Sequence, residues 1–249
     1  MLLGILGLLL NITPANAIIG GVPVSSDEEI SKSIVLLYGV TADKSGFECT
    51  GTILNQEYIL TAAHCALDVR AMFVIFSTDA ESQDKMTALL KDKTYVRNVV
   101  KVNHNIDYPN TTLGSMYPHN DIGLVRFAGG IPAGYKPVTL LNPSVMNQFV
   151  KKDTPIIASG YGIRSGDGTD SGALYKTTLD VLESYPKTVV VGRAGTSVCH
   201  GDSGGPAFVS VGGKLYQWGV ASRVEDSKCS TESVYTPLTS NFYGHMETP

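Results

Sequence analysis

The sequence predicts an all-β protein, built as a barrel or a sandwich. Most apolar residues fall in short runs rich in β-branched and aromatic side chains, which are typical of strands. The 26 Gly and 12 Pro are scattered rather than clustered, as expected where many turns join many strands. A hydrophobic fraction of 43% supports a sizeable core, and no long heptad pattern or internal repeat stands out.

The strand-like runs divide the chain into two halves. The Gly/Pro-rich stretch 129–134 predicts a connector, so we expect an N-terminal unit of residues 18–130 and a C-terminal unit of residues 131–249. We expect strands at residues 34–38, 52–54, 58–61, 72–76, 99–102, 122–127, 155–160, 189–191, 206–210, 216–221 and 234–236.

The N-terminal segment predicts export. Residues 1–10 are almost entirely apolar, and Ala15-Asn16-Ala17 has the small-x-small form of a signal-peptidase site. We therefore expect residues 1–17 to be a signal peptide and the protein to be secreted, extracellular or periplasmic. The apolar run is too short for a membrane span, so no stable membrane anchor is expected. The alternative is a buried apolar N-terminal strand.

Charge and cysteine content indicate which binding partners and which covalent links to expect. A net charge of −4 leaves no basic footprint, so nucleic acid is not an expected partner. Four cysteines in a secreted chain predict two disulfides among three connectivities, with buried free thiols as the alternative. Asp79, Glu81 and Asp84 cluster in one loop, but acidic loops are usually solvated, so neither a metal nor a cofactor is expected. Residues 110–112 form a glycosylation sequon.

The segment Gly201-Asp202-Ser203-Gly204-Gly205-Pro206 is the most informative in the chain. Its glycines let the backbone turn sharply, so that the serine hydroxyl projects and nearby N–H groups point into open space. A serine hydroxyl is a weak nucleophile that needs a base, and the base needs an orienting group. A histidine lies upstream at residue 64 in the segment 61–65, and an aspartate at residue 121 in the segment 120–125.

In the order His, Asp, Ser, these three segments resemble the trypsin/chymotrypsin family of serine peptidases, over residues 18–238. The resemblance implies two antiparallel Greek-key β-barrels with the active site in the cleft between them. It also implies that Ser203 is the nucleophile, His64 the general base and acid, and Asp121 the residue that orients His64. The implied reaction is hydrolysis of peptide bonds through an acyl-enzyme intermediate.

Further residues take roles from the same resemblance. The backbone N–H groups of Gly201 and Ser203 are implied as the oxyanion hole, and Ser222 as a supporting residue beside the aspartate. The implied disulfides are Cys49–Cys65 across the histidine loop and Cys199–Cys229 across the specificity pocket. His200 is expected on the rim of that pocket. The tail, residues 241–249, lacks the clear amphipathic helix that usually ends family members.

Residues 18–22 resemble the mature N-terminus of the family, whose freed α-amino group pairs with the acid before the nucleophile. Here that pair would join Ile18 to Asp202, because a buried carboxylate without a cation is costly. Family zymogens usually carry Arg or Lys before this isoleucine, whereas this chain has Ala17. The hypothesis is that signal peptidase itself creates the activating end, with no separate zymogen.

Specificity is predicted from three aligned positions. The resemblance places Ser197 at the base of the pocket and Val224 and Ser233 on its walls. Without an acid at the base, a substrate Lys or Arg would find no counter-ion. Side chains on the walls predict a shallow, elastase-like pocket for small or medium apolar residues.

Several alternatives stay open. The second interpretation of the pocket is a chymotrypsin-like preference for bulky aromatic residues before the scissile bond. A shift of one or two positions would bring Glu225, Asp226 or Glu232 to a wall, and Arg223 replaces a usual aromatic on the peptide-binding strand. A catalytically silent binding homologue is the alternative from another class, whereas a serine esterase on an α/β fold is disfavoured by the chain order of the triad. The expected partners of a monomeric peptidase are polypeptide substrates, with protein protease inhibitors as further candidates.

Overall fold

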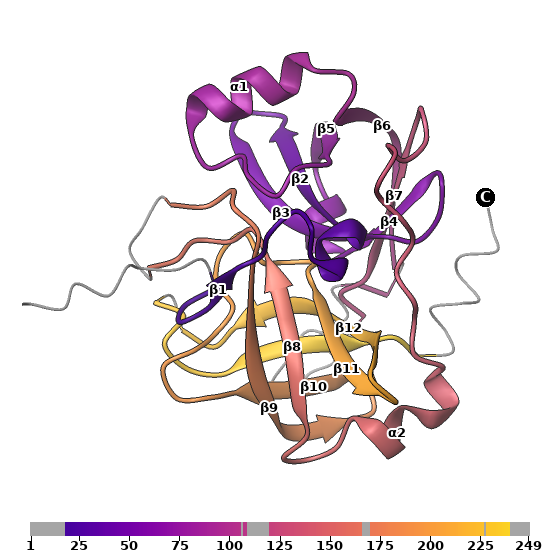
Figure 1. Cartoon of the computed structure of the whole chain (residues 1–249), viewed down its shortest axis with the longest axis vertical. Helices are drawn as coiled ribbons and strands as arrows, with labels where there is room; N and C mark the ends of the chain where they lie inside the picture. The colour runs from indigo at the N-terminus through magenta and orange to yellow at the C-terminus, as the bar shows by residue number, and fades with distance from the viewer. Residues whose placement is uncertain (1–17, 106, 109–119, 166–169, 227, 240–249) are drawn as a thin grey trace, which may run out of the picture.

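The computed structural model describes residues 18–105, 107–108, 120–165, 170–226 and 228–239. Two β-barrels make up the fold, one above the other in Figure 1. This confirms the expected all-β class and the two antiparallel Greek-key barrels. Within the described residues, no helix is long and apolar enough to cross a membrane.

The N-terminal barrel closes on itself through six antiparallel strands. Their spatial order is β2-β3-β4-β7-β6-β5, and pairing of β5 with β2 closes the ring. The first three strands are neighbours, and the last three then return in reverse order, which is a Greek-key arrangement. The strands are β2 (Ile34–Thr41), β3 (Gly46–Ile53), β4 (Tyr58–Thr61), β5 (Val69–Ile75), β6 (Val96–His104) and β7 (Gly123–Phe127).

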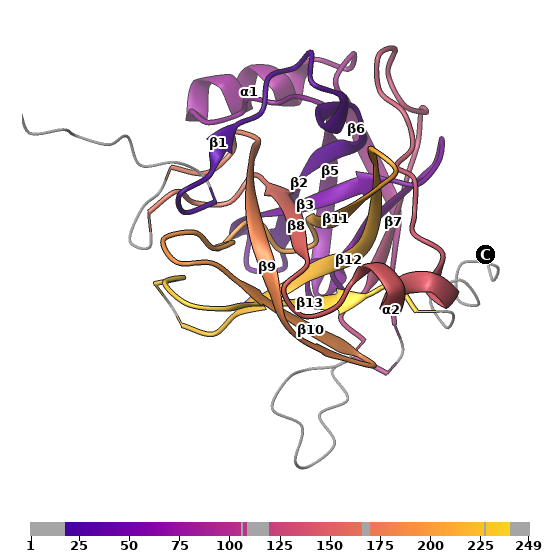
Figure 2. The same ribbon diagram turned by 60° about the horizontal axis from the view of Figure 1, so that its bottom comes forward.

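The C-terminal barrel repeats this topology. Its order is β8-β9-β10-β13-β12-β11, closed by pairing of β8 with β11, and the short β1 (Val22–Pro23) adds to the edge of β9. Figure 2 shows this barrel from its lower end. The strands are β8 (Pro155–Gly160), β9 (Tyr175–Tyr185), β10 (Thr188–Gly192), β11 (Pro206–Val211), β12 (Lys214–Val224) and β13 (Ser233–Pro237).

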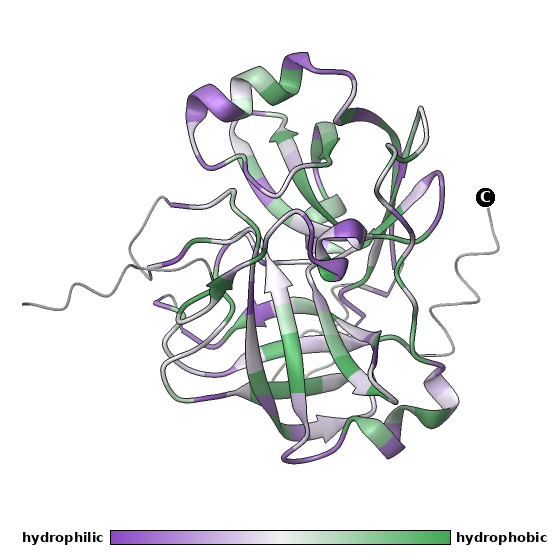
Figure 3. Ribbon diagram, viewed as in Figure 1, coloured by the Kyte–Doolittle hydropathy of each residue, from purple (hydrophilic) through white to green (hydrophobic). Residues whose placement is uncertain are grey.

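Each barrel encloses its own apolar core. In the N-terminal core, Phe76 makes edge contacts with Phe127 and Tyr135, and in the C-terminal core Trp218 packs against Tyr235. Strands that bury one face alternate apolar and polar residues, which Figure 3 shows as changing colour along several of the arrows. Pairing of the first and last strands closes each ring, and the loops between the strands project from these closed sheets.

The helical elements are short and peripheral. Helix α1 (Gln83–Lys91) follows β5 and begins at Ser82, whose Oγ accepts a hydrogen bond from the Lys85 N–H at 3.2 Å. Helix α2 (Met146–Phe149) lies against the outside of the C-terminal barrel. The remaining helical elements are the 3₁₀ turns η1 (Glu29–Ser33), η2 (His64–Ala66) and η3 (Pro143–Val145).

The segment between the barrels contacts both of them. The Val138 N–H donates to the Ile53 carbonyl at 2.8 Å, and the Leu141 N–H donates to the Gln217 carbonyl at 2.8 Å. The barrel strands lie within residues 34–127 and 155–237, and the exact domain boundary at residues 130 and 131 stays a prediction. Docking of the barrels through this connector brings loops of both to one cleft.

Candidate active site

The three residues of the predicted triad lie at the ends of strands. His64 begins η2 directly after β4, Asp121 precedes β7, and Ser203 precedes β11. Strands β4 and β7 pair with Thr61 opposite Gly123, so the histidine and aspartate loops emerge side by side from the N-terminal barrel. Ser203 comes from the C-terminal barrel, so the three meet only because the barrels dock.

Asp121 fixes His64 through two contacts. The His64 ring Nδ1 lies 2.8 Å from Asp121 Oδ2, and the His64 backbone N–H donates to Oδ1 at 3.0 Å. The carboxylate is buried, with 1% of Asp121 exposed, whereas the imidazole is about one third exposed. The carboxylate accepts a hydrogen bond from Nδ1–H, so this geometry selects the tautomer whose Nε2 is free to take a proton.

Ser222 supports the same carboxylate. Its Oγ donates to Asp121 Oδ2 at 2.6 Å. The pairing of β12 with β13 shifts register between Ala221 and Arg223, which makes Ser222 the extra residue of a β-bulge. Bulges re-aim side chains next to active sites, and here the serine hydroxyl is turned toward the aspartate.

Ser203 shares a cavity with His64. Within the described residues, no hydrogen bond joins the Ser203 Oγ to the His64 ring, although both side chains line the same hollow of about 360 Å³. Catalytic hydrogen bonds are often long before substrate binds, and they tighten in the complex.

The N–H groups around Ser203 fall into two sets. Those of Asp202, Gly204 and Gly205 donate to the carbonyls of Cys199, Ala221 and Asp202. In the described part of the chain, the N–H groups of Gly201 and Ser203 donate to no acceptor. Two unused donors beside a serine hydroxyl are the arrangement that stabilises an oxyanion.

Glycine is required at position 201. Its φ is +95°, and a Cβ there would lie 2.8 Å from the Gly162 Cα. Thr50, in β3 of the N-terminal barrel, also binds this turn. Its N–H donates to the Ser203 carbonyl at 2.8 Å, and its hydroxyl donates to the Gly201 carbonyl at 2.9 Å. Both barrels therefore hold the turn.

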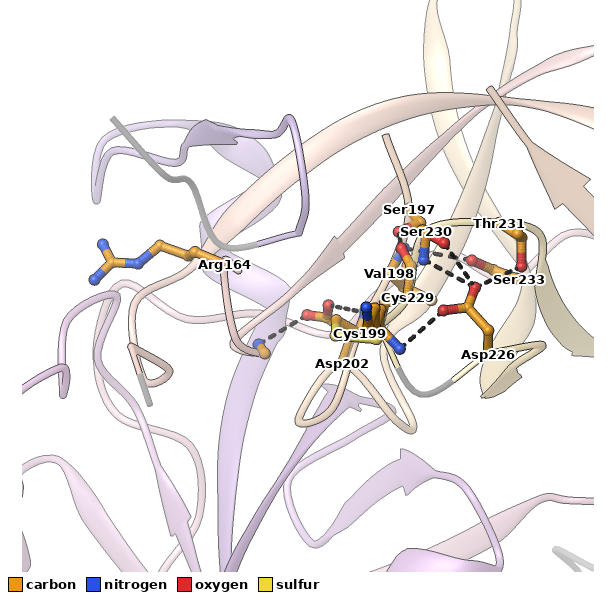
Figure 4. Close-up of a disulfide and its surroundings, with 12 residues drawn as sticks. Arg164, Ser197, Val198, Cys199, Asp202, Asp226, Cys229, Ser230, Thr231 and Ser233 are labelled. Carbon is orange, nitrogen blue, oxygen red and sulfur yellow. Dashed lines mark hydrogen bonds between the residues drawn. A yellow bond between two sulfur atoms is a disulfide. The ribbon is translucent and has the colours of Figure 1, made fainter. Parts of the chain in front are cut away.

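Asp202 is buried beneath the nucleophile. Its two carboxylate oxygens accept from the N–H groups of Gly162 and Cys199, each at 2.8 Å, as Figure 4 shows. Burial raises the pKa of Asp202 to about 7, against the lowering effect of the two hydrogen bonds. No cation pairs with this carboxylate among the described residues.

Ile18 lies in the same region, and among the described residues no hydrogen bond or ion pair joins it to Asp202. Its side chain is fully buried against Tyr175, and the next residue, Ile19, forms a bridge with Ser197. Tyr175 pairs across strands with Gly160, which lies directly against the Asp202 carboxylate. Residues 1–17 lie outside the described residues, so the predicted cleavage after Ala17 stays a prediction.

Both disulfides expected from the resemblance are present. Cys49–Cys65 joins β3 to the turn that carries His64, and Cys199–Cys229 joins the segment before the nucleophile to the loop after β12. The second bridge is the centre of Figure 4.

The cavity is lined by residues of both barrels. It has a volume of about 360 Å³. Of the three predicted pocket positions, Val224 lines this cavity, whereas Ser197 and Ser233 are buried behind the lining. The Ser197 hydroxyl donates to the Cys229 carbonyl, and the Ser233 Oγ accepts from the Val198 N–H at 3.4 Å. The lining residues are His64, Tyr108, Asp121, Val198, Cys199, His200, Ser203, Ala221, Ser222, Arg223 and Val224.

The acids near the cavity point elsewhere. Asp226 accepts from the N–H groups of Lys228 and Ser230 and closes its own loop, as Figure 4 shows in part. Glu225 contacts Arg223, and Glu232 is exposed. Among the described lining residues, Asp121 is the one acid, and it is committed to His64. The alternative in which a shifted alignment brings an acid to the pocket wall finds no support.

A family model described as Trypsin matches residues 18–243. The chain belongs to the trypsin family of serine proteases.

Similarity to individual trypsin-family members is modest. The chain is 25% identical to CLIP domain-containing serine protease B4 of Anopheles gambiae, over 87% of this chain and 65% of the relative. It is 26% identical to chymotrypsin-like elastase family member 1 of Bos taurus, over 89% and 84%. A snake venom serine protease, 2C of Craspedocephalus gramineus, is also 26% identical, over 79% and 77%. The chain spans 65% and 57% of the lengths of two mosquito relatives.

Sequence reasoning on this trypsin-family chain missed Tyr108 and Thr50. Tyr108 lines the cavity beside Asp121, and burial, with a smaller contribution from that carboxylate, raises its pKa to about 12. No local motif marks either residue, because their roles arise from contacts across the fold. His200 is exposed and lines the cavity, whereas residues 110–112 and the tail beyond residue 239 lie outside the described residues.

Proposed function

We propose that the protein is a secreted serine endopeptidase that cleaves polypeptides through an acyl-enzyme. The observation that carries this proposal is the cavity shared by Ser203 and a His64 held at 2.8 Å from a buried Asp121 carboxylate. Unused N–H donors at Gly201 and Ser203 support it. The two disulfides support export, because such bonds persist in oxidising compartments.

The proposed chemistry needs no group beyond the chain and water. Ser203 Oγ attacks the substrate carbonyl, its proton passes to His64 Nε2, and Asp121 stabilises the imidazolium. The N–H groups of Gly201 and Ser203 bind the oxygen that becomes negative. His64 then protonates the leaving amine, and a water molecule, deprotonated by His64, releases the acyl group by the same route in reverse.

We infer that a free α-amino group at Ile18 activates the enzyme. A buried Asp202 without a cation supports this assignment, since an ammonium group would compensate the buried charge. The burial of Ile18 beside Tyr175 supports it further, because Tyr175 pairs with Gly160, which lies against the Asp202 carboxylate. Sequencing the N-terminus of active protein tests this proposal, and an active form that begins upstream of Ile18 would refute it.

For specificity we propose small or medium apolar residues before the scissile bond. The cavity wall carries the Val224 side chain, and the one acid among the described lining residues, Asp121, is committed to His64 and Ser222. The similarity to an enzyme called chymotrypsin-like elastase is consistent with this preference. The tests are a panel of chromogenic peptides that differ in the residue before the bond, and labelling by a fluorophosphonate probe.

The results of these tests separate the alternatives. Fast cleavage after Ala or Val supports the proposal, and fast cleavage after Arg contradicts it. Cleavage mainly after Phe or Tyr indicates the chymotrypsin-like alternative. Absence of both labelling and cleavage identifies a catalytically silent homologue.

Replacement of Val224 with glycine is expected to change this preference. Removing the side chain deepens the cavity, so the ratio of kcat/KM for a Phe peptide to that for an Ala peptide should rise about tenfold or more. The matched control is Val100→Gly, because Val100 is an exposed valine in β6, away from the cavity. An equal ratio in both variants would assign the depth of the pocket to other residues.

A further inference from the structure

Three consecutive residues, Gly162 to Arg164, link the oxyanion loop to the N-terminal barrel. We define the oxyanion loop as residues 200–203. The Gly162 N–H donates to Asp202 Oδ1 at 2.8 Å, and the Ile163 N–H donates to the His200 carbonyl at 2.8 Å. Two of the hydrogen bonds that fix the oxyanion loop therefore come from the residues just before Arg164.

Arg164 is anchored by two carboxylates. Its Nε lies 3.1 Å from Asp170 Oδ2, and its backbone N–H donates to Asp170 Oδ1 at 2.9 Å. The other side of the guanidinium contacts Glu81, which lies just before α1 in the N-terminal half. Only 15% of the Arg164 side chain is exposed, so the cation is largely withdrawn from water and depends on these partners.

The same guanidinium contacts the residue that covers Ile18. The Arg164 Cζ lies 5.8 Å from the centre of the Tyr175 ring, and Nη1 donates to the Tyr175 hydroxyl at 3.4 Å. Tyr175 in turn packs on Ile18. Figure 4 shows the Arg164 side chain directed away from Asp202, so it acts on that carboxylate only through the backbone.

Backbone bonds reinforce this junction between the halves. The Ala80 N–H donates to the Gly172 carbonyl at 2.8 Å, and the Leu174 N–H donates to the Thr78 carbonyl at 2.9 Å. The segment 78–81 thus contacts Gly172 and Leu174 through its backbone and Arg164 through the Glu81 side chain. Loss of the arginine would leave Glu81 and Asp170 facing each other without their shared cation.

We propose that Arg164 is a positioning residue that holds the oxyanion loop in its catalytic geometry through Gly162 and Ile163. Arg164 does not line the active-site cavity, so it acts without touching substrate. The inference rests on the proposed peptidase function for its kinetic consequence, whereas the ordering of the loop can be measured without any substrate.

The test compares Arg164→Gln with Arg193→Gln. Arg193 is a matched control, because it also makes two hydrogen bonds to one carboxylate, that of Asp180, but within the C-terminal barrel and 43% exposed. Hydrogen–deuterium exchange of peptides covering residues 198–205 should accelerate about tenfold or more in R164Q and stay unchanged in R193Q. In the same preparations kcat should fall about tenfold in R164Q, with little change in KM.

Two further variants separate positioning from general stability. Lysine keeps the charge but lacks the planar fork, so R164K should restore only part of the protection. E81Q removes the carboxylate partner in the N-terminal half while Arg164 itself is unchanged, and it serves as the decisive variant if R164Q does not fold. Unchanged exchange and kcat in R164Q or E81Q, relative to R193Q, would overturn the inference. If the wild-type protein shows no cleavage that depends on Ser203, the proposed function is refuted instead. The exchange data would still test whether Arg164 orders residues 200–203.

Discussion

The Ser203→Ala variant is expected to lose about six orders of magnitude in kcat and all labelling by a fluorophosphonate. The hydroxyl is the nucleophile in the proposed reaction, and no other described serine or threonine hydroxyl lines the cavity except Ser222, which donates to Asp121. The fold should survive, because the Ser203 groups that make structural contacts belong to the backbone. Turnover of an Ala peptide, with thermal unfolding as the folding control, provides the measurement.

His64→Ala gives the sharper form of this prediction. The serine acts only when the histidine takes its proton, so the two residues work as a unit. The double variant S203A/H64A should therefore be about as slow as either single variant rather than slower by the product of both losses. Multiplicative losses would show that the two side chains act independently, which contradicts the proposed mechanism.

Local pattern was enough to predict much of the fold. The expected strands at 58–61 and 155–160 match β4 and β8, because both are short runs that contain β-branched residues. The strand β9 was missed, although it is among the longest strands described. Its buried positions Leu179 and Val181 alternate with polar residues, so the segment lacks the continuous apolar run on which the other strands were predicted, and closure of the barrel gives it its partners.

The candidate site was likewise predicted only in part from the sequence. The catalytic motifs could be predicted because each needs particular residue types in a short segment. The contacts of Thr50 and Arg164 could not be predicted from the sequence. Thr50 binds Gly201, which is 151 residues away, and Arg164 binds Glu81, which is 83 residues away. Such contacts depend on how the two barrels dock, which no local spacing encodes.

Processing at Ile18 is expected to change how stability depends on pH. While Ile18 remains joined to Ala17, Asp202 has a pKa of about 7 because it is buried, against 3.8 in its ordinary state. Between these values the folded state keeps a proton that the unfolded state has released, so stability falls as pH rises from about 4 to about 7. The difference in pKa corresponds to about 4 kcal/mol. Above pH 7 this group causes no further loss.

A free ammonium group at Ile18 would remove this penalty by favouring the charged carboxylate. Urea unfolding between pH 4.5 and 7.5 should therefore show a falling free energy of unfolding for the form that retains residues before Ile18, and a smaller fall for the form that begins there. Asp202→Asn supplies the control, because it deletes the titrating group and should flatten that part of the curve in the unprocessed form. Equal slopes in the two forms would argue against the Ile18–Asp202 pair.

The same pair predicts the catalytic cost of D202N. In the processed enzyme this variant leaves the α-ammonium of Ile18 buried without its counter-ion, and breaking a buried pair from one side costs about 3–5 kcal/mol. The oxyanion donors flank Asp202, so we expect kcat/KM to fall by about two to three orders of magnitude. Carbamylation by cyanate provides the independent readout, since the α-amino group should be protected in the wild type and reactive in D202N. An α-amino group equally reactive in both would show that Ile18 is not inserted, and Asp202 would then need another explanation for its burial.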